Sequence, residues 1–322
     1  MKNIRWQSLF FRNPYLLTLV LLVIAILINF YFQPALFGRT TLNNNMRVLL
    51  PLVCLAAGQA VVVLGGGIDI SVGAIVEIVN VILATQLGAN ASTNKTVSFL
   101  LLVLLVGMVA GAVNGFFIAY LRLQPIITTY ATSFLFAGVA LYILPAPGGT
   151  IPTSFSSFYR DTTPLGLPLA FFIIPLFLIG WVLLRHTRYG HYLMAMGGQP
   201  GAAYESAVPV SAVQFSTYII SGLMAALGGI AITLLTAAGN AGIGDSLTLP
   251  SITAVVIGGT ALRGGVGGVA GPIIGALILT LIKNIISFAN VNLWWQTFVN
   301  AAIIVLALAG PGLVNLLRRK PS

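Results

Sequence analysis

The sequence predicts an all-α polytopic membrane protein with about ten transmembrane helices. Hydrophobic side chains make up 58% of the 322 residues and charged ones only 6%, and the mean hydropathy is +1.02. Soluble globular chains do not have this composition. Stretches such as 15–32, 99–121 and 171–184 carry no charge. One helix needs about 20 apolar residues to cross a hydrocarbon core.

The apolar stretches define ten expected spans, and the whole chain 1–322 is expected to form a single transmembrane domain. The first span follows a basic segment, Met1 to Arg12, but it is roughly 18 residues long and no small-x-small cleavage site follows it. We therefore interpret it as an uncleaved helix rather than a signal peptide. The expected spans are 14–33, 46–64, 67–87, 97–121, 126–144, 168–186, 212–236, 247–262, 268–288 and 293–314.

The net charge of +10 arises from 15 Lys and Arg residues in short loops, which report membrane orientation rather than nucleic-acid binding. Ten spans place both termini on one side. If that side is cytoplasmic, it holds ten basic residues: Lys2, Arg5, Arg12, Arg122, Arg185, Arg188, Arg263, Arg318, Arg319 and Lys320. The other side receives Arg39, Arg47, Lys95, Arg160 and Lys283. The sequence thus predicts a multi-pass protein of the inner (plasma) membrane with cytoplasmic termini.

Two long loops and a possible internal symmetry complete the expected organisation. The outside loop, about 145–168, is rich in Pro, Gly, Ser and Thr and suits a docking face. The inside loop, about 185–210, is where a cytoplasmic partner could press. Spans 2–5 and 7–10 are separated by a single sixth span, so they would run in opposite senses and could form an inverted repeat.

Only five carboxylates occur in the chain. Asp161 and Asp245 are expected in outside segments and Glu205 in the inside loop, where solvated charges are ordinary. Asp69 and Glu77 fall within a predicted span, where each must face a partner, a backbone nest or a wet cavity.

The glycine-rich segment 65–73 contains Asp69 and Ser71 between two apolar stretches. Glycine permits a sharp re-entry of the chain, and the two polar side chains could cap the helix that follows. Two interpretations remain open: a structural cap, or a broken helix that lines a transport path.

A second glycine-rich segment, 258–268, lacks the ending of a phosphate loop and lies between two spans, so close helix packing explains it better. Small residues four apart, as in Gly107 and Gly111 or Gly271 and Gly275, predict the same. His186 and His191 have no nearby acidic group, and Cys54 has no cysteine partner. We therefore expect no catalytic site, metal or cofactor.

Four motifs together resemble the permeases of ATP-binding-cassette importers for ribose-type monosaccharides, in the branched-chain amino acid/ribose permease superfamily. They are Gly-Ile-Asp-Ile-Ser-Val-Gly at 67–73, Gly-Ala-Val-Asn-Gly at 111–115 before Leu-Arg-Leu-Gln-Pro at 121–125, Thr-Arg-Tyr-Gly at 187–190 leading to Ala-Met-Gly-Gly-Gln at 195–199, and Ala-Val-Val-Ile-Gly-Gly-Thr-Ala-Leu at 254–262. The match runs along nearly the whole chain.

This resemblance implies a dimeric permease that receives its solute from a periplasmic binding protein and is driven by a separate cytoplasmic ATPase. The coupling element of the family matches Gly197 through Pro209. The residues implied in ATPase coupling are Arg188, Gly190, Gly197, Gly198, Ala202, Ala203, Glu205 and Ser206.

The chain departs from the family pattern at two places. Ala-Ala-Tyr-Glu-Ser-Ala at 202–207 replaces the usual Ala-Ala-Arg-Leu-Ser-Gly, and Thr-Leu-Pro at 248–250 replaces Glu-Leu-Asp. Both departures favour a heterodimer with a second permease that supplies the missing groups, although a homodimer stays open.

The sequence therefore predicts half of a translocation pathway for a small polar solute, most simply a monosaccharide. Hydroxyl-rich solutes exchange hydrogen bonds with polar side chains in or beside spans. The candidate pathway residues are Gln59, Asp69, Ser71, Asn80, Asn114 and Thr128. The alternatives are import of a nucleoside or an amino acid by the same machinery, and a carrier or channel that works alone.

Overall fold

The computed structural model describes residues 14–289 and, beyond them, Asn292, Trp295, Phe298, Ala301, Ala302 and Val305. The last predicted span, 293–314, lies almost wholly outside the described residues. The basic residues of 1–12 and the terminal Arg318, Arg319 and Lys320 also lie outside them.

All the regular elements of the described part are helices, which confirms the predicted all-α class. In chain order they are α2 (Pro14–Phe32), α3 (Arg39–Leu64), α4 (Val72–Gln86), α5 (Thr93–Ala119), α6 (Pro125–Ile143), α7 (Thr153–Asp161), the 3-10 turn η1 (Pro164–Gly166), α8 (Leu169–Arg185), α9 (Arg188–Gly198), α10 (Pro200–Glu205), α11 (Val210–Thr236), α12 (Asp245–Ile257) and α13 (Ala270–Phe288).

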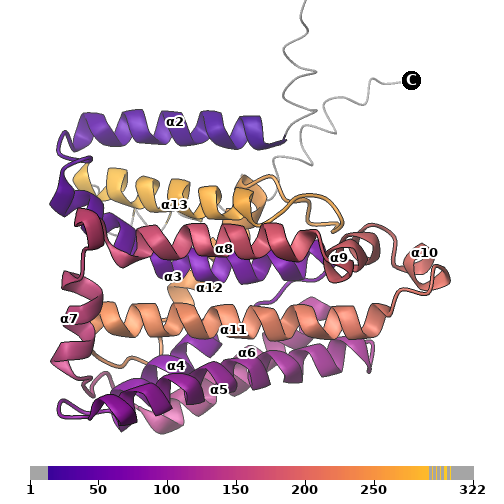
Figure 1. The fold of residues 1–322 in the computed structure, drawn as a ribbon, viewed down its shortest axis with the longest axis horizontal. Coiled ribbons are helices and arrows are strands. Elements are labelled where there is room, and N and C mark those ends of the chain that lie inside the picture. The colour runs from indigo at the N-terminus through magenta and orange to yellow at the C-terminus, as the bar shows by residue number, and fades with distance from the viewer. Residues whose placement is uncertain are drawn as a thin grey trace, which may run out of the picture.

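The long helices lie side by side in a bundle, and the two long loops lie at its opposite ends (Figure 1). The segment 145–168, predicted as a loop, lies at one end of the bundle and contains the short helix α7. The segment 185–210 forms α9 and α10 at the other end. Helix α2 begins at the end that carries α9 and α10, so residue 14 lies on the same side as the inside loop.

Five helices of the described part are long and apolar enough to cross a membrane, namely α3, α5, α6, α11 and α13. A sixth crossing results if α8 and α9, which are bent by 81° against each other, count as one span. Helices α4 and α12, which the sequence predicts as full spans at 67–87 and 247–262, are shorter than predicted, because each follows a non-helical segment.

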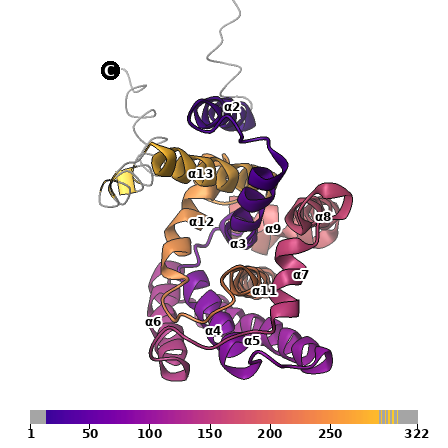
Figure 2. The same cartoon turned by 90° about the vertical axis from the view of Figure 1, so that its left-hand side faces the viewer.

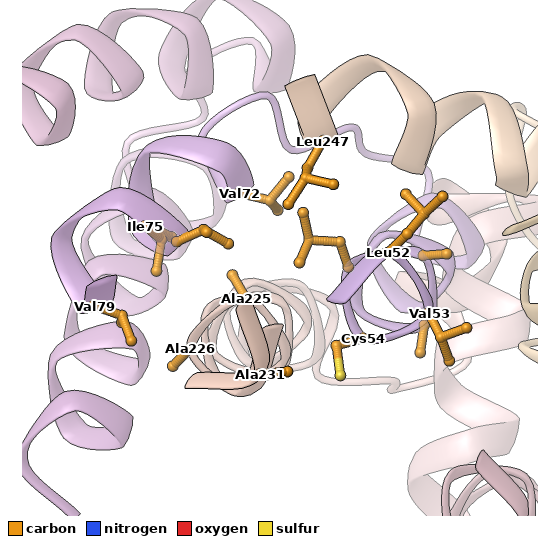
Figure 3. Packing of buried hydrophobic residues seen from close by; sticks show 14 of the residues in the cluster. Leu52, Val53, Cys54, Val72, Ile75, Val79, Ala225, Ala226, Ala231 and Leu247 are labelled. Atoms are coloured by element: carbon orange, nitrogen blue, oxygen red, sulfur yellow. The ribbon is translucent and has the colours of Figure 1, made fainter. Parts of the chain in front are cut away.

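Helix α11 lies within the bundle, where it packs against α3, α4 and α5 (Figure 2). Alanines on α11 allow the apolar side chains of its neighbours to approach closely. Figure 3 shows this core, in which Leu52 of α3, Val72 and Ile75 of α4, Ala225 of α11 and Leu247 of α12 pack together.

Glycines bring backbones together at two helix pairs, as their spacing predicts. An added Cβ on Gly107 or Gly111 of α5 would strike the backbone of α11, and one on Gly222 of α11 would strike α5. Gly271 and Gly275 of α13 face the backbone of α12 in the same way. Without a hydrophobic drive in lipid, this close packing is a main source of helix association.

The outer faces of the bundle expose large apolar side chains, including Leu101 of α5 (64%), Phe134 of α6 (62%) and Leu183 of α8 (65%). Hydrocarbon, rather than water, is the solvent that suits such surfaces.

The contact between α5 and α11 can be tested with Gly111→Ala. The added methyl group would meet the Tyr218 carbonyl oxygen, a backbone atom that cannot move aside, so we expect a loss of about 1–3 kcal/mol in stability. Thermal unfolding in detergent measures this loss. Gly138→Ala on α6 is the control, because nothing lies within 4 Å of its added Cβ. Equal melting temperatures for the two variants would contradict the packing described.

Candidate functional site

Two helices are interrupted inside the bundle. Residues 65–71 separate α3 from α4, and residues 237–244 separate α11 from α12. Helix α4 has 15 residues and α12 has 13, so their lengths are roughly 22 and 20 Å at 1.5 Å per residue. Each is shorter than the roughly 30 Å hydrocarbon core. The preceding non-helical segment must therefore supply part of each crossing.

The first interruption depends on its glycines. Gly66 adopts a φ of 82°, a left-handed conformation that other residues avoid. Gly67 passes so close to the Tyr218 hydroxyl and to Val62 that no side chain would fit there. This confirms the expected sharp turn at the glycine-rich segment.

The second interruption is fastened by a side chain of α4. The Asn80 amide donates to the Thr233 hydroxyl (2.9 Å) and to the Ala238 carbonyl (3.0 Å), and its oxygen accepts from the Asn240 backbone N–H (2.7 Å). Gly239 also forms an antiparallel bridge with Gly148 in the α6–α7 loop, with N–O distances of 2.8 and 2.9 Å. Asn80 thus satisfies backbone groups that the end of α11 leaves without helical partners.

The two short helices meet at their N-termini. The backbones of Gly73 in α4 and Gly244 before α12 approach too closely for a Cβ on either one. Their apolar neighbours Val72 and Leu247 lie together in Figure 3. Each helix N-terminus carries a partial positive charge. Negative groups near this meeting point are therefore favoured.

Asp69 provides one such group, at the start of α4. One carboxylate oxygen accepts from the Ser71 backbone N–H (2.9 Å) and hydroxyl (2.7 Å), and the other accepts from the Ser221 hydroxyl of α11 (2.8 Å). The Gln59 amide, in the orientation that satisfies both of its ends, pairs with the Asp69 backbone N–H and carbonyl at 3.1 and 3.0 Å. Asp69 is fully buried. The expectation that it faces partners is confirmed.

The network continues into α5 and α6. Asn114 donates to the Ser71 hydroxyl (2.7 Å) and accepts from the Thr132 hydroxyl (2.6 Å). The Thr129 hydroxyl accepts from the Ile70 backbone N–H at 3.1 Å. Ser71 occupies the N-cap position of α4, but its side chain does not cap the helix, because the hydroxyl donates to Asp69 instead.

The predicted pathway residues therefore fall into three places. Gln59, Asp69, Ser71 and Asn114 belong to one buried network around the first interruption. Asn80 holds the second interruption. Thr128 donates to the Gln124 carbonyl of its own helix at 3.0 Å and takes no part in either.

Glu77 provides the second negative group, at the start of α12. It is 1% exposed, and the backbone N–H groups of Gly244 and Asp245 interact with its carboxylate. Its Oε1 atom has no hydrogen-bond partner among the described residues. The Glu77 carboxylate of α4 thus faces the N-terminus of α12, which has no side-chain cap of its own.

Several residues of the site were not predicted. Ser221, Thr129, Thr132 and Thr233 are ordinary small polar residues in apolar helices, and only the packing shows which groups they face. Asp245, which the sequence analysis assigns to an outside segment, is the first residue of α12. Its side chain is exposed, and α12 itself lies between α6 and α13 (Figure 2).

The inside loop contacts the end of α3 and the segment that follows α12 through glycines. The Gly265 backbone N–H donates to the Leu64 carbonyl, the last residue of α3, at 2.9 Å. Gly197 of α9 lies against both groups, so an added Cβ would collide with Leu64 and Gly265. We call Leu64, Gly197 and Gly265 the glycine junction.

The other predicted coupling residues lie along α9 and α10. Arg188 begins α9, and the buried Gly190 donates its N–H to the Thr187 hydroxyl at 3.3 Å. Ala203 is buried. The exposed members of the set are Arg188, Gly198, Ala202, Glu205 and Ser206.

Comparison with known proteins matches this chain to transport permeases. A family model for the branched-chain amino acid transport system permease component matches residues 41–308. The ribose import permease protein RbsC of Escherichia coli K12 is 31% identical over 90% of this chain and 91% of its own length. RbsC of Bacillus subtilis is 33% identical, over 92% and 91%. The galactose/methyl galactoside import permease protein MglC of E. coli K12 is 32% identical, over 92% of each chain. No solved structure matches.

The Asp69 network can be tested with Ser221→Ala. This change leaves one oxygen of a buried carboxylate without its donor, so we expect a loss of about 1.5–3 kcal/mol in stability. Ser133→Ala on α6 is the matched control, because the Ser133 hydroxyl bonds only the Tyr130 carbonyl of its own helix. Unfolding in detergent measures both variants. The network would lose its assigned role if Ser221→Ala were no less stable than the control.

Proposed function

The chain belongs to the permease family of the branched-chain amino acid transport system, and on this premise we propose that it is the membrane subunit of an ATP-driven importer for a monosaccharide. The observation that carries the proposal is its similarity, over about 90% of both chains, to permeases named for ribose and galactose. In this proposal the chain forms half of a translocation pathway and performs no chemistry, and ATP is hydrolysed on a separate subunit.

The proposed topology has ten crossings within one transmembrane domain, in the inner (plasma) membrane with both termini cytoplasmic. Two observations support it. The start of α2 lies at the end of the bundle that carries α9 and α10, and ten spans with a cytoplasmic N-terminus assign ten of the 15 basic residues to the cytoplasmic side.

We also propose an inverted repeat that relates α3–α6 to the helices from α11 onward. In each half a long helix is followed by a non-helical segment and a short helix, α4 in one half and α12 in the other. The two short helices meet at their N-termini. Transporters built from inverted repeats commonly place interrupted helices at the membrane centre, where a solute crosses.

The pathway is proposed to follow the exposed surface of α12. Asp245 and Ser246 are exposed there, and a charged side chain within a transmembrane bundle faces a wet cavity or a partner rather than lipid. The buried candidate residues would not contact the solute directly but would hold α4 and the second interruption in place. They are Gln59, Asp69, Ser71, Asn80 and Asn114. Thr128 would contribute from α6.

Three kinds of partner follow from the proposal. The ATPase would dock on α9 and α10, the solute-binding protein on the opposite end near α7, and a second permease subunit would complete the pathway. Tyr204 is 75% exposed and Glu205 is exposed beside it. These two residues stand where the family usually has Arg-Leu. Together with Pro250 inside α12, they favour a heterodimer over a homodimer.

Coupling to the ATPase can be tested with Gly197→Ala. The added methyl group would force α9 away from Leu64 and Gly265, so we expect uptake by the assembled complex to fall about tenfold or more while ATP hydrolysis continues.

Gly138→Ala on α6 is the matched control, because nothing lies within 4 Å of its added Cβ and it lies outside the predicted coupling residues. Its uptake should stay near that of the wild type. If Gly138→Ala lost uptake equally, the effect would not come from the glycine junction.

The proposed function itself is tested by reconstitution. Purification of the chain from its native membrane should bring down an ATPase, and uptake into liposomes should require that ATPase, ATP and a solute-binding protein. The solute that co-purifies with the binding protein should be a monosaccharide. If the binding protein instead held a nucleoside or an amino acid, that compound would replace the monosaccharide as the proposed substrate. Uptake by the chain alone would refute an ATP-driven importer.

A further inference from the structure

Helix α8 packs against α3 and α9 but stands away from α11, which leaves a narrow apolar cavity along its second half. The cavity measures about 280 Å³. Its walls are Phe177, Gly180 and Trp181 of α8, Val61 of α3, and Ile220 and Met224 of α11. From Leu176 to Leu184 it follows α8 for roughly 12 Å. No charged side chain lines it.

A second hollow of about 440 Å³ lies beside the first, at the end of α8. Trp181 lines both hollows. The second is lined by Arg185 and His186 on one side, and by Gly268 and Ala270 at the start of α13 on the other. Thus an apolar cavity and a basic hollow, here called the basic mouth, adjoin at Trp181.

The basic mouth lacks an acidic partner within the described part of the chain. Arg185 and His186 are exposed, no ion pair or side-chain hydrogen bond satisfies them there, and no carboxylate lines either hollow. The first turn of α13 also carries no acidic residue. Its backbone N–H groups add to the positive potential of the mouth.

The position of the mouth suits a lipid headgroup. It lies at the last turn of a candidate span, at the end of the bundle that carries α9 and α10. Trp is enriched at this depth of a bilayer, and basic pockets between helices near the cytoplasmic surface bind anionic headgroups. A second copy of this chain is a poorer occupant, because a net charge of +10 would bring positive charge to a positive mouth.

We propose that this groove binds one anionic phospholipid of the bilayer. An acyl chain occupies the apolar cavity beside Gly180, and the phosphate lies against Arg185 and His186. The lipid thereby fills the space between α8 and α11, close to the start of α9. The site is independent of the solute that the pathway carries.

Native mass spectrometry of the purified full chain, incubated with phosphatidylglycerol or with phosphatidylcholine of the same acyl chains, tests the proposal. We expect one phosphatidylglycerol molecule to be bound more tightly than phosphatidylcholine. Arg185→Gln should weaken phosphatidylglycerol binding by about fivefold and leave phosphatidylcholine binding unchanged. Arg122→Gln, in the α5–α6 turn, is the charge control.

A second pair of variants tests the cavity. Nothing lies within 4 Å of an added Cβ on Gly180 or on Gly138, and both glycines are exposed on apolar helices. Gly180→Phe should fill the cavity and abolish the tightly bound lipid, whereas Gly138→Phe on α6 should not. If Gly180→Phe fails to fold, Arg185→Gln alone decides the matter, because it changes only a surface charge.

Three results would overturn the proposal. They are equal binding of the two lipids by the wild type, equal lipid loss in Gly180→Phe and Gly138→Phe, and a change of oligomeric mass in Gly180→Phe with lipid binding unaltered. The last result would assign the groove to a contact between copies of the chain.

Discussion

A helix that stops inside hydrocarbon releases backbone N–H and C=O groups that no water can satisfy, so the protein must supply their partners. This constraint governs the centre of the molecule. Gln59 pairs with both backbone groups of Asp69, Thr129 accepts from Ile70, and Asn80 binds Ala238 and Asn240. Polar side chains from α3, α4 and α6 thus bond backbone groups at the two places where the helices are interrupted.

The same constraint explains why α11 is built from small residues. The Asp69 network is possible only if α3, α4 and α5 all approach α11 closely. Ala225 and Ala226 are fully buried, and Gly222 meets the backbone of α5 directly. Larger residues would hold α5 away and leave Ser221 out of reach of Asp69. Close packing and polar satisfaction therefore depend on each other in this fold.

The fold class and most helix positions could be predicted from hydropathy alone, because a long apolar run in a charge-poor chain has few other structures open to it. The lengths of α4 and α12 could not, since an apolar segment that crosses the bilayer without helical structure has the same composition as a helix. Asp69 and Glu77 were identified by the cost of a buried charge. Their partners were not, because Ser221 and Gly244 are far from them in sequence and ordinary in kind. The exact start of α12 at Asp245 could not be predicted either, because an apolar run does not show where its helix begins.

The hydrogen bonds of Asn80 to the second interruption couple the positions of two helices. Asn80 belongs to α4, yet it binds the segment before α12, and Glu77 on the same helix meets the N-terminus of α12. A shift of α4 along its axis would break these bonds unless residues 238–245 moved with it. The two interrupted helices are therefore linked as a single moving part. A displacement of either interrupted helix would be transmitted to the other through Asn80 and Glu77.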